Sequence, residues 1–122
     1  MTDIARFRNF FQHFTEIIEE SVVDEELILK NCNTLLSCLF DSVYLLPDQF
    51  ATPNQLRYQQ YLLYCDPMER FSVVSFVWGP GQKTPVHDHT VWGMVGVMRG
   101  SEICEEFNFD PDSGNLLAAG SH

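Results

Sequence analysis

Apolar side chains recur at steps of three and four residues along the first part of the chain. Between Asp3 and about Glu20 they are Ile4, Phe7, Phe10, Phe11, Phe14, Ile17 and Ile18. This spacing is the period of a helix that carries one apolar face. Thr2 or Asp3 can cap the first turn, so the sequence predicts an amphipathic helix up to about residue 20.

A second helical pattern runs from about Asp24 to Asp41. Its apolar positions are Leu27, Leu35, Leu36, Leu39 and Phe40. Three acidic residues fall in its first turn, where the positive end of the helix dipole stabilises negative charge: Asp24, Glu25 and Glu26. We interpret this acidic cluster as a helix start with solvated side chains rather than as a metal site.

The period becomes that of strands after Pro47 and Pro53. The tyrosine- and leucine-rich segment 58–64 favours a strand, and Asp66-Pro67 favours a turn. The alternating segment 71–78 predicts a second strand, which Gly79-Pro80-Gly81 ends sharply. We expect further strands at about 85–90, 92–98 and 101–109, turns at Arg99-Gly100 and 110–114, and a last strand near Leu116.

Helices followed by antiparallel strands give an α+β order. We expect a single domain over residues 1–122, helical over 1–46 and rich in strands over 56–122. A closed barrel of about eight strands, with turns every 8 to 12 residues, needs on the order of eighty residues. Residues 71–122 are too few for that, so the pattern predicts an open sheet whose last strand has an unpaired edge.

The composition indicates a core-forming protein, because 45% of the 122 residues are hydrophobic and 13% are aromatic. Seventeen acidic residues against 7 basic ones give a formal net charge of -10. This charge argues against non-specific binding to nucleic acid or to anionic membranes. The apolar runs are also far too short to cross a bilayer.

The cysteines, Cys32, Cys38, Cys65 and Cys104, include no C-x-x-C pair, and no secretory leader precedes them. These features fit a reducing cytoplasm. Cys32 and Cys38 lie in the second helical pattern, where we expect buried, structural thiols.

One segment has a histidine spacing that is compatible with metal binding. His87 and His89 stand between Gly81 and Gly100 in an apolar stretch expected to be extended. In a strand, residues i and i+2 project to the same side, so the two imidazoles can bind one metal ion while Asp88 points away.

Four segments together suggest a family. They are Tyr58 to Tyr64, Phe71 to Gly81, Pro85 to Gly93 and Arg99 to Glu102. In this order they resemble the type I cysteine dioxygenase family of the cupin superfamily, and within it the bacterial 3-mercaptopropionate dioxygenases. The resemblance implies non-haem Fe(2+), held by three histidines inside a small β-barrel. It also implies oxidation of a small thiol, 3-mercaptopropionate or cysteine, to its sulfinic acid with O2.

The resemblance also implies which residues contact the substrate. Gln60 stands where the cysteine-specific enzymes have an arginine for the substrate carboxylate, and Gln59 is the alternative at this position. Tyr58 is the second candidate, with core packing as its other role. Gly93 replaces the glutamate of the general cupin motif, and it replaces the cysteine that is cross-linked to a tyrosine in the cysteine-specific enzymes, so no such cross-link can form here.

The third metal ligand stays open. The family's third histidine would lie beyond His122, so the resemblance implies a cupin barrel (a double-stranded β-helix, or jelly roll) without its C-terminal part. We expect a half-buried or solvated side chain at His13 and a frayed terminus at His122. Glu102 or Glu105 can complete a two-histidine, one-carboxylate iron site, although nothing in their spacing favours them over solvated charges.

The implied partners are a small thiol and O2, with no nucleic acid and no membrane. The open barrel edge also allows self-association. Two other functions stay open: an inactive truncated remnant or interaction module without iron, and another metal-dependent cupin, such as an isomerase that uses Mn or Zn.

Overall fold

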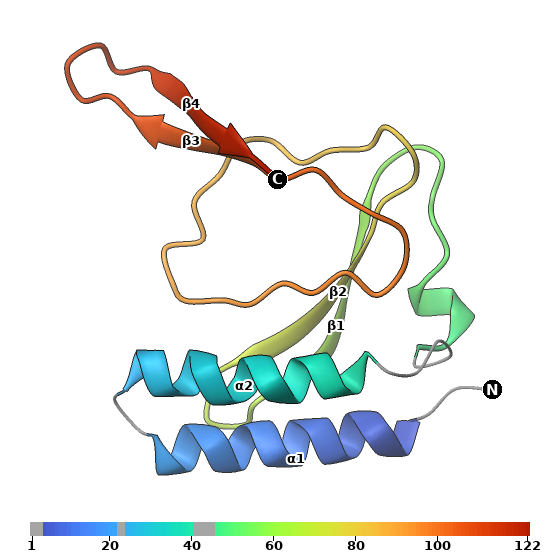
Figure 1. The fold of residues 1–122 in the computed structure, drawn as a ribbon. Helices are drawn as coiled ribbons and strands as arrows, with labels where there is room; N and C mark the ends of the chain where they lie inside the picture. Colours follow the sequence, from blue (N-terminus) through green and yellow to red (C-terminus); the bar gives the residue numbers. More distant parts are fainter. Residues whose placement is uncertain (1–3, 22–23, 41–45) are drawn as a thin grey trace.

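A computed structural model describes residues 4–21, 24–40 and 46–122. Two helices come first and two antiparallel hairpins follow, so the protein is mixed helix and sheet (Figure 1). The elements are α1 (Ile4–Glu20), α2 (Glu25–Leu39), a 3-10 turn (Asp48–Phe50), β1 (Gln59–Cys65), β2 (Ser72–Val77), β3 (Glu105–Phe109) and β4 (Leu116–Ser121). Strand β1 pairs with β2 and β3 pairs with β4, and these described strands form no closed barrel.

The predicted first helix is confirmed as α1. It buries Phe7, Phe10, Phe14 and Ile18, while Ile4 at its start stays exposed. The expected cap at Thr2 or Asp3 lies outside the described residues.

The predicted second helix is confirmed as α2, and the Asp24 side chain caps it by accepting a 3.1 Å hydrogen bond from the Leu27 amide. Its buried stripe runs through Ile28, Cys32 and Leu39. Leu27, one of the apolar positions of the predicted helix, falls outside this stripe and is exposed.

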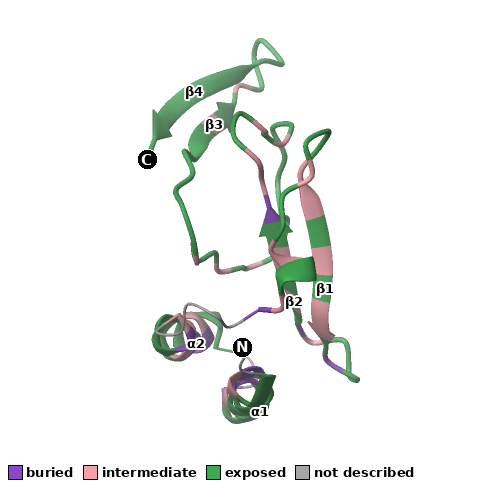
Figure 2. Cartoon of the chain, turned by 90° about the vertical axis from the view of Figure 1, so that its right-hand side faces the viewer, coloured by how far each residue is buried: buried purple, intermediate pink, exposed green. Residues whose placement is uncertain are grey.

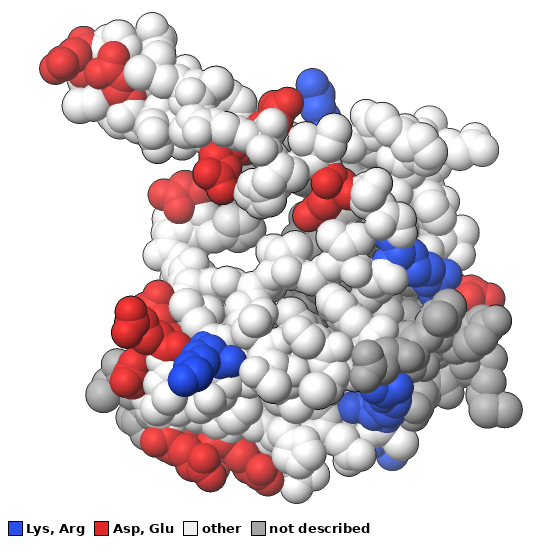
Figure 3. Space-filling view, viewed as in Figure 1, with Lys and Arg blue, Asp and Glu red and all other residues white. Residues whose placement is uncertain are grey.

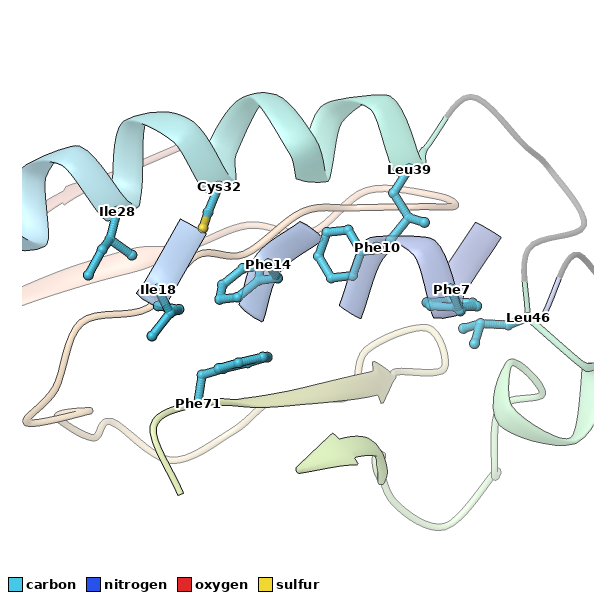
Figure 4. Close-up of a cluster of buried hydrophobic side chains, with 9 residues drawn as sticks. All are labelled: Phe7, Phe10, Phe14, Ile18, Ile28, Cys32, Leu39, Leu46 and Phe71. Atoms are coloured by element: carbon cyan, nitrogen blue, oxygen red, sulfur yellow. The ribbon is translucent and has the colours of Figure 1, made fainter. Parts of the chain in front are cut away.

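The core forms where α1 meets α2 and the turn end of the first hairpin (Figure 4). Phe14 lies at its centre, with its ring centroid 5.6 Å from that of Phe10 and 4.5 Å from that of Phe71. Tyr64 stacks on Phe11 at 4.5 Å. Aromatic side chains thus join α1 to the hairpin, while α2 adds Ile28, Cys32 and Leu39 to the same cluster.

Strands β1 and β2 confirm the strands predicted at 58–64 and 71–78. Gln59 pairs with Val77 at one end and Cys65 with Ser72 at the other, with an irregular register between Leu62 and Tyr64. Leu63, Tyr64 and Val73 pack against the core. Figure 2 shows exposed positions alternating with half-buried ones along both strands.

The turn between β1 and β2 is fixed by a buried charge. Asp66 is only 2% exposed and accepts hydrogen bonds from the Arg70 side chain at 2.7 and 3.0 Å and from the Arg70 amide at 3.1 Å. These bonds lower the pKa of the Asp66 carboxyl. Arg70 also reaches Glu19 of α1 at 3.6 Å, so the turn is linked to the helical layer.

The strands predicted at 85–90 and 92–98 are wrong, because residues 78–104 form one long loop. Trp92, Met94 and Met98 still turn toward the core, while Val91 and Val95 are exposed. Side chains in this part of the loop therefore do alternate between the core and the solvent. A strand also needs a neighbour to accept its backbone hydrogen bonds, and the described strands pair only with each other.

The β3–β4 hairpin extends away from the core, and nearly all of its residues are exposed (Figure 2). The expected turn at 110–114 is confirmed: Asp110 accepts hydrogen bonds from the Asp112 amide and the Ser113 hydroxyl, and Gly114 adopts φ +72°. The last strand near Leu116 is confirmed as β4. The strand predicted over 101–109 forms only from Glu105.

Acidic side chains gather at the tip of this hairpin and along the helical layer (Figure 3). Neither described helix is both long and apolar enough to cross a membrane.

Replacing Phe14 by alanine should reduce the free energy of unfolding by about 3 kcal/mol or more, because Phe14 is 5% exposed and its loss leaves a cavity in the aromatic cluster. Urea denaturation followed by circular dichroism measures the change. Phe109→Ala is the matched control, since Phe109 is 66% exposed and its loss should cost less than about 1 kcal/mol. An equal loss of free energy of unfolding in the two variants would contradict the central position of Phe14 in the core.

Replacing Asp66 by asparagine should lower the melting temperature at pH 7, because Arg70 loses its anionic partner. The folded-state pKa of Asp66 is lowered, so its stabilisation is complete above the unfolded pKa of about 4 and disappears as pH falls through the folded pKa. The difference between wild type and variant should therefore shrink below about pH 4. Asp112→Asn removes the same charge from an exposed turn and should show little effect at any pH. A difference in melting temperature that does not change with pH would contradict a role for the Asp66 charge.

Candidate metal centre

The two histidines lie on a loop that is held at both ends. Before them, the Gln82 side chain donates to the Asn54 carbonyl at 2.5 Å and accepts from the Gly79 amide at 2.7 Å. After them, Trp92 stacks over Phe14 with ring centroids 6.4 Å apart. The segment between these anchors extends into solvent, and residues 85–91 are all exposed.

His87 and His89 point their ring nitrogens at each other, with the two Nε2 atoms 3.2 Å apart. Two nitrogens bound at about 2.1 Å to one ion lie about 3.0 Å apart at a right angle and about 3.4 Å apart at the tetrahedral angle. The observed distance lies between these values. The two Nε2 atoms are within hydrogen-bond distance of each other, and their spacing is also one that two ligands of a single metal ion can have once the proton between them is lost.

The other ring nitrogen of His87 has a separate partner. Nδ1 lies 2.7 Å from the Pro85 carbonyl oxygen, which can only accept a hydrogen bond. The proton must therefore be on Nδ1, and the lone pair on Nε2. Histidines that bind metals in proteins usually have this arrangement, because the outer hydrogen bond fixes the tautomer and the ring orientation.

A local turn, rather than a strand, brings the two rings together. The Asp88 carboxylate accepts a 2.8 Å hydrogen bond from the Thr90 amide, and Thr90 adopts the left-handed φ of +59°. The expectation that strand geometry aligns His87 and His89 is wrong, because no strand forms here. The Asp88 side chain is engaged in closing the turn.

None of the four candidates for a third ligand is joined to this pair in the structure. His13 lies on α1 and borders a shallow depression beside α2. His122 pairs through its backbone with Cys104 at the end of the second hairpin, and its Nδ1 lies 3.7 Å from Glu106. Glu102 is exposed on the loop and Glu105 is exposed at the start of β3. Within residues 4–21, 24–40 and 46–122, no three His, Cys, Asp or Glu side chains are grouped to hold an ion.

Gln60 and Tyr58 lie on the outer face of the first hairpin. Gln60 is exposed and pairs across the sheet with Phe76. Tyr58 stacks on Trp78 at 6.1 Å, and Trp78 stacks on Phe76 at 5.3 Å. An aromatic row thus runs beside the Gln60 amide.

Phe76 is a member of this row that was not predicted from the sequence. The alternation of Val74, Phe76 and Trp78 was the available signal, because these positions share one face of a strand. The alternative residue Gln59 lies on the other face, where its side chain accepts a hydrogen bond from the Tyr61 hydroxyl. Gln60 is therefore the glutamine whose amide is open to a ligand. No hydrogen bond links the Gln60 side chain to either imidazole among the described residues.

The cysteines add no ligand to the pair. Cys32 is fully buried, and burial raises the pKa of its thiol to about 11, so it stays protonated and is confirmed as a structural thiol. Cys38 is exposed, so the expectation of burial is wrong for it. Cys65 and Cys104 are exposed free thiols.

No protein family model matches this chain. What can be said of its function therefore rests on the paired imidazoles, the neighbouring motifs and the outer face of the first hairpin.

The paired imidazoles should bind a divalent ion. We expect His87→Ala combined with His89→Ala to abolish binding of Co²⁺ or Zn²⁺ in calorimetric titrations of the untagged chain, because each lost nitrogen removes a ligand. His13→Ala, with its histidine on α1, is the control and should bind the ion as wild type does. Undiminished binding in the double variant would place the metal elsewhere.

Proposed function

We propose that this protein is a non-haem iron thiol dioxygenase of the cysteine dioxygenase type, acting on 3-mercaptopropionate or a similar small thiol. The observation that carries the proposal is the 3.2 Å separation of the His87 and His89 Nε2 atoms, with His87 oriented by the Pro85 carbonyl. The motif resemblance from Tyr58 to Glu102 supplies the reaction class. Imidazole is a ligand that ferrous iron accepts readily.

We further propose that the described strands belong to a cupin barrel. The outer face of the first hairpin exposes Leu62, Val74 and Phe76, which an isolated two-stranded sheet would not be expected to leave in water. The outer edges of the hairpin are also unpaired among the described strands. Both features are those of a sheet that continues around a barrel.

His87 and His89 would hold the iron, and Fe(2+) supplies coordination positions at which a thiolate and O2 meet. The Gln60 amide would donate a hydrogen bond to the carboxylate of the substrate and so orient its sulfur. The row formed by Tyr58, Trp78 and Phe76 would wall the site and exclude water from one side. A glutamine at position 60 resembles the 3-mercaptopropionate-type enzymes, whose substrate lacks an amino group.

A second candidate function follows from the lack of a third ligand among the described residues. Two protein ligands without a third hold an ion weakly and leave its redox chemistry uncontrolled. This favours a metal-binding or interaction module without oxygenase activity, or a cupin that uses another metal. Measurement of O2 consumption distinguishes these functions, because only a dioxygenase consumes O2 together with the thiol.

Wild-type protein loaded with Fe(2+) should consume O2 faster with 3-mercaptopropionate than with cysteine, and should form the sulfinic acid. Gln60→Arg should shift the ratio of kcat/KM toward cysteine by about tenfold, equivalent to about 1.4 kcal/mol, because the resemblance implies that the cysteine-specific enzymes have an arginine at this position. An oxygen electrode with product analysis measures both.

Gln55→Arg is the control for added positive charge, because Gln55 is exposed and precedes β1. It should leave the ratio unchanged. An unchanged ratio in Gln60→Arg would remove Gln60 from the substrate site, and iron binding without any thiol-dependent O2 consumption would favour the second function.

A further inference from the structure

The two histidines supply only two ligands of a metal ion's coordination sphere. It offers two nitrogens to an ion, and the described part of the chain brings no third donor to them. The loop that carries the pair is exposed throughout residues 85–91, so nothing described covers the metal-binding side of the rings. An ion bound here would keep positions that a ligand from outside the chain can take.

We propose that two copies of this chain share one divalent ion, each contributing His87 and His89. The inference rests on the metal pair of the proposed function and not on dioxygenase activity. Four imidazole nitrogens complete a tetrahedral sphere, which is the arrangement that Zn²⁺ prefers. The 3.2 Å separation of the two Nε2 atoms within each pair is close to the tetrahedral value of about 3.4 Å, so each pair has to open only slightly.

The side chains around the pair suit a second copy. Val86 and Val91 flank it and are 55% and 74% exposed, and a facing loop would shield these apolar side chains. Asp88 stands between the two histidines, and its carboxylate is already held by the Thr90 amide. Two Asp88 carboxylates would balance the two positive charges of the ion, which limits the build-up of charge where the loops meet.

The overall charge opposes this pairing. Each chain has a formal net charge of -10, and acidic side chains spread over much of the face shown in Figure 3. Repulsion between such chains weakens as salt shortens the screening length from about 30 Å at 0.01 M to about 8 Å at 0.15 M. The metal-bridged pair should therefore tighten with added NaCl, whereas an assembly held by ion pairs between chains would loosen.

The experiment is a zinc titration of the untagged full chain, first freed of metal with a chelator and followed by sedimentation velocity and metal analysis. Monomer should convert to dimer, with the dimer maximal at half an ion per chain. Excess chelator should reverse it. His87→Ala and His89→Ala should each lose the dimer, while His13→Ala and His122→Ala, which remove the other two histidines, should keep it. Circular dichroism checks that each variant is folded, as expected for substitutions at exposed positions.

Each outcome decides the proposal. One ion per chain in a monomer overturns the shared site and leaves the thiol dioxygenase proposal standing. A dimer at half an ion per chain without thiol-dependent O2 consumption supports the shared site and removes the enzyme. A dimer that persists with chelator or in His87→Ala overturns the bridge and assigns the contact to the apolar sheet face or an open strand edge. Absence of metal binding overturns both proposals.

Discussion

The packing around Phe14 is the interaction on which the rest of the structure depends. This ring lies against Phe10 within α1, against Phe71 just before β2 and against Trp92 at the end of the histidine loop. One side chain thus joins the helical layer, the first hairpin and the candidate metal site. A two-stranded hairpin has little stability in water by itself, so its attachment to the helices is a condition for its order. The buried Asp66–Arg70 pair adds a polar link at the tip of the same hairpin.

The histidine pair illustrates how a metal half-site can form without a sheet. Two local contacts determine it, Pro85 to the His87 ring and Asp88 to the Thr90 amide, and each joins residues two positions apart. A third contact, Gln82 to Asn54, ties the start of the loop to a distant segment. The short-range contacts cannot bring in a ligand from elsewhere, and among the described residues no third donor is grouped with the pair.

Burial is distributed unevenly over the chain. The helices and the first hairpin share a cluster of buried residues that includes Phe7, Phe10, Ile28 and Leu46, while β3 and β4 contribute none to it. The second hairpin is held by its own backbone pairing and by the Asp110 turn. Apolar side chains such as Ile103, Phe109 and Leu117 remain in water. Such side chains are available to further packing partners, which fits both the barrel proposal and a contact between chains.

The sequence by itself determined the features that depend on neighbours in the chain. The three- and four-residue period of phenylalanines determined α1, the alternation around Phe76 determined β2, and Asp24 and Asp110 determined a helix start and a turn through their short side chains. The convergence of His87 and His89 was also predictable, although the turn that produces it was not. Only the tertiary structure decided which alternating segments became strands. Residues 92–98 alternate as well as 72–77 do, but a strand forms where a partner accepts its hydrogen bonds, and β1 lies beside only the second of these segments. Whether Leu27 or Ile28 faces the core was likewise decided by the position of α1, because both are apolar and the sequence pattern separates them by only one residue.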